Sequence, residues 1–166
     1  NIVRLTRFQP IGRRPWDGGN ADGGFTFVEP LEYHSSANRE LMVIVQIVDP
    51  EVLDDVEAIA ELDGFDMLFF GPGDFSQGIG APGEWTHPLL IETRKRVAQV
   101  ANQYGKFAGT VGSPANLDEL TAMGYHFVSL GADVVGLSNY CKQLVQSFDK
   151  KESETKSNSY LDNQKP

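Results

Sequence analysis

The sequence predicts an α/β fold built from four successive strand–helix units. Apolar segments of strand length alternate with longer segments in which apolar residues recur at helical spacing. Glycine or proline stands at most boundaries between these segments. Strict alternation of this kind is typical of a parallel sheet flanked by helices. Four units would form half of a (β/α)₈ barrel or a small doubly wound sheet, and the pattern alone leaves both open.

Each predicted strand leads into a predicted helix. The first strand, 41–48, is β-branched and apolar almost throughout, which is typical of a parallel strand buried on both faces. Asp49 is expected to cap the helix that follows, because Pro50 suits the first helical position. Gly64 is expected to end that helix. The later strands are expected at 66–70, 106–112 and 126–131, and the later helices at 88–104, 117–123 and 133–148.

The segment Phe69–Ser76, with the sequence FFGPGDFS, delivers a carboxylate just beyond a strand. Its Gly-Pro-Gly stretch cannot prolong the strand, so Asp74 follows the strand's carboxyl end. Ligands bind at that end of the strands in parallel α/β folds, and a carboxylate there suits a hard cation such as Mg²⁺. The residues alone support equally well a structural role, in which Asp74 caps the following helix.

Other positions could carry chemistry or serve the fold. Gln46 interrupts the first strand and could face a ligand, although buried glutamines with structural partners are at least as common. His87 precedes a helix, where capping or packing is a more common role than acid–base catalysis. Arg13 and Arg14 could bind a carboxylate or phosphate, but an ion pair is the more common role in an acidic protein.

Composition narrows the class of protein. The 166-residue chain has a formal net charge of −9, which argues against nucleic-acid binding, and no apolar run approaches the length of a membrane span. A single cysteine, Cys141, excludes an intramolecular disulfide and fits a reducing compartment, so we expect a cytoplasmic protein. Because the chain opens without methionine, we expect it to be part of a longer polypeptide. We expect a domain over 1–148 and a flexible, charged and polar tail over 149–166.

Several motifs, in their order and spacing, resemble the HpcH/HpaI family of class II pyruvate aldolases. They are Val45–Ile47, Gly64–Asp66, Phe70–Ser76, His87-Pro88, Gly105–Gly109 and Phe127–Asp133. The stretch Gly12–Gly23 resembles the branch that includes macrophomate synthase, and the whole resemblance runs from Arg4 to Phe148. It implies the C-terminal part of a swapped-helix (β/α)₈ TIM barrel, usually assembled into hexamers.

The resemblance also implies roles for individual residues. Asp74 matches a ligand of a divalent metal (Mg²⁺, Mn²⁺ or Co²⁺), and Gly73 matches the neighbour whose backbone contacts the carboxylate of pyruvate. Gln46 matches a glutamine that contacts the substrate, and Val111 matches an apolar residue beside the pyruvate. The family's second metal ligand is a Glu two residues after the glutamine, where this chain has Val48. We therefore expect weakened metal binding.

The function that the resemblance implies is a metal-dependent carbon–carbon lyase, an aldehyde-lyase that acts on pyruvate or another 2-keto acid through a pyruvate enolate. The family's catalytic Arg, with a nearby His and Asp, lies on earlier strands that have no match here, so no catalytic residue is assigned. Val48 and the missing strands favour an alternative, a weak or inactive homologue that acts as an assembly partner. A third possibility is a small doubly wound domain that binds an anionic ligand.

Overall fold

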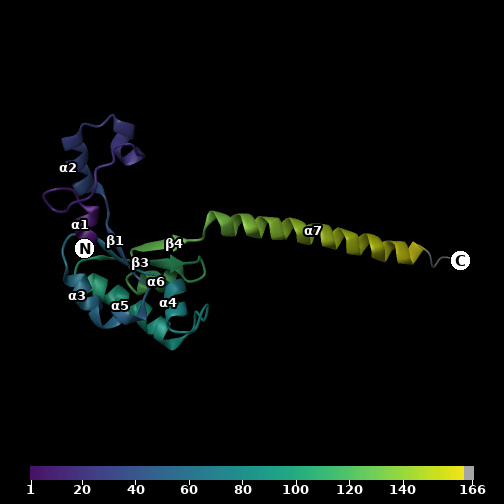
Figure 1. Ribbon diagram of the computed structural model, residues 1–166. Coiled ribbons are helices and arrows are strands. Elements are labelled where there is room, and N and C mark those ends of the chain that lie inside the picture. Colours follow the sequence, from purple (N-terminus) through teal and green to yellow (C-terminus); the bar gives the residue numbers. More distant parts are fainter. Residues whose placement is uncertain (163–166) are drawn as a thin grey trace. The chain divides into compact units, whose positions relative to one another are not determined.

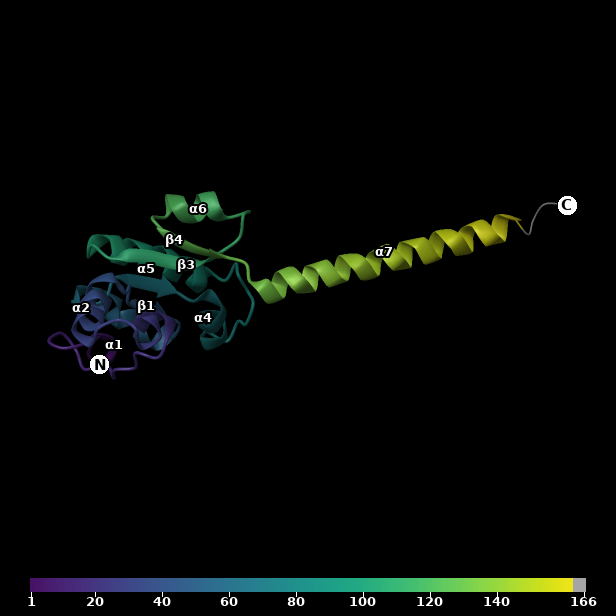
Figure 2. The ribbon, with the colours of Figure 1, turned by 90° about the horizontal axis from the view of Figure 1, so that it is seen from above.

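The computed structural model describes the backbone of residues 1–162 and the side chains of residues 1–148. The chain separates into two compact units, Asn1–Ser129 and Leu130–Pro166. The first unit contains nearly all of a parallel sheet and the helices packed on it, and the second consists mainly of helix α7, Asp133–Asp162 (Figures 1 and 2). The tail expected from residue 149 onward lies outside the residues whose side chains are described, and it stays a prediction.

The sheet has four strands in the order of the sequence. They are β1 (Ile44–Ile47), β2 (Met67–Phe70), β3 (Phe107–Gly112) and β4 (Phe127–Leu130). The pairs β1–β2 and β2–β3 are parallel, with Ile44 opposite Met67 and Met67 opposite Phe107. A doubly wound sheet reverses its strand order at a switch point, whereas barrel strands follow one another in sequence. The observed order therefore favours half of a barrel, as the sequence resemblance implied.

Helices follow the strands, although the helix after the first strand ends at Glu61, before the Gly64 that was expected to end it. The described α-helices of the first unit are α1 (Ile2–Thr6), α2 (Pro30–Glu40), α3 (Val56–Glu61), α4 (Pro72–Gly78), α5 (Pro88–Gln103) and α6 (Leu117–Ala122), with 3₁₀ helices η1 (Ala21–Thr26) and η2 (Pro50–Asp55). Asp49 caps η2 as expected, since its Oδ1 accepts a hydrogen bond of 2.9 Å from the backbone N–H of Glu51. In the part of the chain that the structure describes, no helix is long and apolar enough to cross a membrane.

The two faces of the sheet differ in cover. The core lies on one face, where the fully buried Leu68, Phe70 and Ala108 pack with side chains of α3 and α5. On the other face Ile44, Phe107 and other large apolar side chains are almost half exposed. The prediction that the first strand is buried on both faces was therefore wrong for this chain. Strand neighbours alternate between faces, and residues 1–129 supply helices for one of them.

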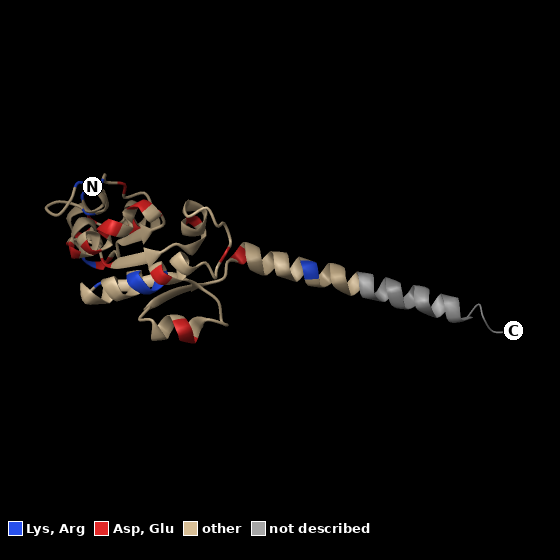
Figure 3. Ribbon diagram, turned by 90° about the horizontal axis from the view of Figure 1, so that it is seen from below, with Lys and Arg blue, Asp and Glu red and all other residues tan. Residues whose placement is uncertain are grey.

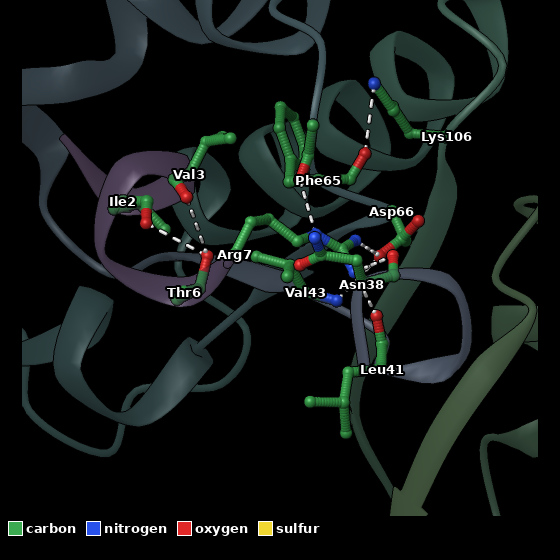
Figure 4. A network of polar contacts seen from close by, with 11 residues as sticks. Ile2, Val3, Thr6, Arg7, Asn38, Leu41, Val43, Phe65, Asp66 and Lys106 are labelled. Carbon is green, nitrogen blue, oxygen red and sulfur yellow. Dashed lines mark hydrogen bonds and ion pairs between the residues drawn. The ribbon is translucent and has the colours of Figure 1, made fainter. Parts of the chain in front are cut away.

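A buried arginine ties the N-terminal segment to the edge of the sheet (Figure 4). The guanidinium of Arg7 donates hydrogen bonds to the backbone carbonyls of Leu41, Asn38 and Gly64, at 2.7, 3.0 and 3.4 Å. It also forms an ion pair of 2.9 Å with Asp66, whose other partner is the backbone N–H of Val43. Arg7 thus connects α1, the end of α2 and the starts of β1 and β2.

A second ion pair joins α3 to α5 on the covered face. Nε and Nη2 of Arg96 donate to the two carboxylate oxygens of Glu57, at 3.1 and 2.7 Å. The hydrogen bond from Arg96 holds the pKa of Glu57 below its ordinary value of 4.5. Figure 3 shows other acidic residues as red segments on several helices of the first unit. The pair is about 40% exposed, so its contribution to stability is small.

The Glu57 pair predicts a specific dependence of stability on pH. Because the folded pKa lies below the unfolded one, the stabilisation is fully present above about pH 4.5 and is lost as the pH falls through the folded pKa. We expect Glu57→Gln to lower the free energy of unfolding by about 0.5 kcal/mol at pH 7. The difference from the parent chain should shrink below pH 4. Urea unfolding at both pH values measures it, and a difference that does not change with pH would contradict the prediction.

Candidate functional site

Two side chains of the first strand–helix unit converge on a glycine at the end of β2. A Cβ atom at Gly71 would lie 2.7 Å from Nε2 of Gln46 and 2.7 Å from Cγ1 of Val48. Gly71 also donates a backbone hydrogen bond of 3.0 Å to Ile47, which joins the ends of β1 and β2. Glycine is needed here because any side chain would displace both neighbours. Gln46 is exposed and not a buried glutamine with structural partners.

Asp74 is a free carboxylate at the same edge of the sheet. Helix α4 begins at Pro72 with Gly71 as its N-cap, and Asp74 lies in the first turn. The side chain is exposed, and among the described residues nothing donates a hydrogen bond to it or pairs with it. The interpretation of Asp74 as a helix cap was therefore wrong, and its carboxylate is available to a ligand.

The backbone beside Asp74 is both fixed and open. Ser76 is buried, and its Oγ donates a hydrogen bond of 2.7 Å to the carbonyl of Gly73 while accepting one of 3.1 Å from the N–H of Gly83. These bonds fix the Gly-Pro-Gly turn against the loop that follows α4. A Cβ atom at Gly73 would meet nothing within 4 Å, so a small ligand can reach this backbone. Sequence reasoning missed Ser76, although it stands inside the motif.

Val111 brings the third strand to the same edge. Phe70 pairs with Thr110, so Val111 is level with Gly71 on the neighbouring strand. Its side chain is almost half exposed, on the uncovered face. The structure therefore brings together all four positions that the resemblance implied, at the carboxyl ends of three adjacent parallel strands. This is the edge at which parallel α/β folds bind ligands.

A divalent metal does not fit the residues at this edge. The methyl groups of Val48 stand beside Gly71, where a second carboxylate would be needed. Asp49 cannot replace it there, because its carboxylate caps η2. In the region whose side chains are described, no three His, Cys, Asp or Glu residues gather closely enough to hold a metal. Asp74 is left as a single anionic ligand, and such a site binds weakly.

His87 and Arg14, two of the remaining candidates, serve the fold. Nδ1 of His87 accepts a hydrogen bond of 3.3 Å from the N–H of Leu89, which confirms a capping role. Arg14 forms an ion pair of 2.9 Å with Asp22. The carboxylate of Asp22 also accepts a hydrogen bond of 2.8 Å from the hydroxyl of Tyr33. The hydrogen bonds from Tyr33 and Arg14 hold the pKa of Asp22 below its usual value. Arg13 is exposed.

The fold is half of a (β/α) barrel, and the candidate residues lie at the carboxyl ends of its strands. The model of the HpcH/HpaI aldolase/citrate lyase family matches residues 1–139, and the chain belongs to this family. It is 32% identical over 135 residues to 2-keto-3-deoxy-L-rhamnonate aldolase of Klebsiella pneumoniae. It is 30% identical over 150 residues to 5-keto-4-deoxy-D-glucarate aldolase of an Enterobacter species.

Solved structures show the same similarity. An HpcH/HpaI aldolase/citrate lyase family protein from Burkholderia cenocepacia is 31% identical with a TM-score of 0.75, and 89% of this chain covers 58% of that one. An HpcH/HpaI aldolase from Desulfitobacterium hafniense has a TM-score of 0.76 at 26% identity, over 88% of this chain and 57% of that one. Macrophomate synthase has a TM-score of 0.72 at 27% identity, over 91% of this chain and 54% of that one.

The shares of the two chains differ. The first curated relative is matched over 81% of this chain but 50% of its own length, and the second over 89% and 57%. The chain thus spans about half the length of the curated relatives that it matches. The resemblance of the sequence to this family and the partial barrel fold are both confirmed.

Proposed function

We propose that this chain forms the C-terminal half of a carbon–carbon lyase that binds pyruvate, or another 2-keto acid, at the end of β2. The observation that carries the proposal is the open backbone of Gly73 beside the free carboxylate of Asp74, with the amide of Gln46 at the neighbouring strand end. Two curated relatives are named as aldolases of keto-deoxy sugar acids, which supports a keto acid as the ligand.

Each residue at this edge has a role in the proposal. The backbone of Gly73 contacts the carboxylate of the keto acid, because nothing covers it. The amide of Gln46 contacts a substrate oxygen, and Val111 supplies an apolar wall on the adjacent strand. Asp74 is the one carboxylate among them. The family's catalytic Arg, His and Asp have no match in this sequence, so the proposal assigns to this chain the recognition of the keto acid.

The proposal includes a divalent metal for which this chain supplies one ligand and lacks the second. A divalent ion supplies Lewis-acid stabilisation of an enolate oxygen when it is bound. This chain offers Asp74 as one ligand for Mg²⁺, Mn²⁺ or Co²⁺, and Val48 removes the second. The alternative function, a weak or inactive homologue that acts as an assembly partner, is favoured by this same valine. The uncovered apolar face of the sheet is compatible with both the lyase and the assembly partner, since the remaining half of a barrel or another chain would cover it. We also propose that the protein forms a homo-oligomer such as a hexamer.

Gly73→Ala tests the keto-acid site. The new methyl group meets nothing within 4 Å and the position needs no left-handed backbone, so we expect the fold and its stability to be unchanged. We expect binding of pyruvate to weaken at least tenfold, because the methyl fills the approach to the backbone (roughly 1.4 kcal/mol or more). Saturation-transfer NMR of pyruvate in the presence of Mg²⁺ measures this binding.

Gly136→Ala is the matched control, since it is also a helical glycine with open space around its Cβ position. It should bind pyruvate as the unaltered chain does. No binding of pyruvate by the unaltered chain would contradict the proposed function. Binding of pyruvate without any effect of Gly73→Ala would place the keto acid elsewhere.

A further inference from the structure

A hollow lies beside the keto-acid site, between the loop after β2 and the loop after β3. Its lining includes Pro72, Trp85, Arg94, Val111, Ser113 and Asn116, and its volume is about 360 Å³. Pro72 adjoins Gly73, and Val111 is the apolar wall of the proposed site. A molecule in the hollow would therefore lie next to a keto acid at Gly73. The volume suits a small organic molecule and not only a water.

Arg94 gives this hollow its charge. Its Nε is buried and has no hydrogen-bond partner within the described part of the chain. Four other arginines, at positions 7, 14, 39 and 96, each form an ion pair with a carboxylate. Arg94 forms no such pair with the described residues, and the lining contains no Asp or Glu. In a protein of net charge −9, a partly buried arginine without a carboxylate is ready for an anion.

The surroundings hold Arg94 and add neutral polar groups. The hydroxyl of Tyr125, which is buried, donates a hydrogen bond of 2.8 Å to the backbone carbonyl of Arg94 and fixes this turn of α5. Oδ1 of Asn116 accepts from the N–H and the hydroxyl of Ser113, at 2.7 and 3.1 Å. The NH₂ group of Asn116 has no partner among the described residues and remains a donor toward the hollow.

We propose that the hollow binds a small carboxylate through Arg94, and that this is the carboxylate of the aldehyde half of the lyase substrate. The second part of the statement rests on the proposed function, and the first does not. A guanidinium binds a carboxylate with two parallel hydrogen bonds. One cation with neutral donors suits a singly charged carboxylate better than a phosphate, which carries more charge. The acceptor is thus assigned to the class of short aldehyde acids.

Glycolate and glycolamide test the subsite. They have nearly the same size, and glycolate alone carries a charge. We expect glycolate to shift the amide NMR signals of Ser113 and Asn116 and the indole signal of Trp85 at constant ionic strength, and we expect glycolamide to leave them unchanged. Arg94→Met should weaken glycolate binding by about tenfold, the range for a hydrogen bond to a charged group. Arg94→Lys keeps the positive charge but lacks the planar guanidinium, so it should lose less affinity for glycolate than Arg94→Met.

Lys95→Met is the matched control, because it removes the same charge from the next, exposed position of α5. It should bind glycolate like the unaltered chain. Equal NMR shifts with glycolamide, or a loss of glycolate affinity in Lys95→Met equal to that in Arg94→Met, would overturn the proposal. If Arg94→Met does not fold, Arg94→Lys tests whether glycolate binding depends on the guanidinium of Arg94. The buffer contains neither metal nor pyruvate, so the glycolate test does not depend on the keto-acid site. A chain that binds glycolate through Arg94 but does not bind pyruvate in the saturation-transfer experiment would contradict the proposed function and leave the subsite intact.

Discussion

Val48→Glu is expected to raise the affinity of the chain for Mn²⁺ by roughly 10- to 100-fold, because the number of anionic ligands controls the affinity of such sites. Val48 lies beside Gly71, and its side chain converges there with that of Gln46. A glutamate at this position would add a second carboxylate to the edge that carries Asp74. Calorimetric titration of Mn²⁺ with pyruvate present measures the change.

Two variants control the Val48→Glu experiment. Val48→Gln has the same length without the charge and should bind Mn²⁺ as weakly as the unaltered chain. Asp74→Asn, introduced together with Val48→Glu, should remove the gain, since only one carboxylate then remains at the site. Tight binding by the unaltered chain would mean that Asp74 has another ligand. Equal binding by the Glu and Gln variants would show that the site needs strands that this chain does not contain.

Arg7→Met is expected to lower the free energy of unfolding by about 3 kcal/mol, at the lower end of the range for breaking a buried ion pair. The Arg7 side chain is 8% exposed and the Asp66 side chain 39%, so water partly solvates the carboxylate that remains. The larger part of the loss comes from the carbonyls of Leu41 and Asn38, which lose a charged donor in a partly buried region of the fold. Urea unfolding measures the change.

Arg39→Met is the control for the Arg7 prediction. Arg39 also pairs with a carboxylate, that of Glu40, but both side chains are almost 70% exposed. We expect this variant to change the free energy of unfolding by less than about 0.5 kcal/mol. Similar losses in the two variants would show that the Arg7 contacts add little to what a surface pair supplies.

Local patterns in the sequence determined much of the fold. The alternation of apolar runs with helical segments predicted the four strand–helix units, because backbone geometry imposes a period of two on strands and 3.6 on helices. The helix caps at Asp49 and His87 depend on a few neighbouring residues, so the sequence also predicted them. The position of GPGDFS beyond a strand followed from glycine and proline. Family resemblance then supplied Gln46, Gly73, Asp74 and Val111 as candidates.

Tertiary structure decided the features that depend on which distant residues meet. Helices cover one face of the sheet in residues 1–129, so Gln46 is exposed and β1 is not buried on both faces. The chain contains seven arginines that look alike in sequence, and only the packing makes Arg7 a buried connector and leaves Arg94 unpaired in a hollow among the described residues. Strand register and crossover connections bring together residues 20 to 60 positions apart, and no local pattern encodes that proximity.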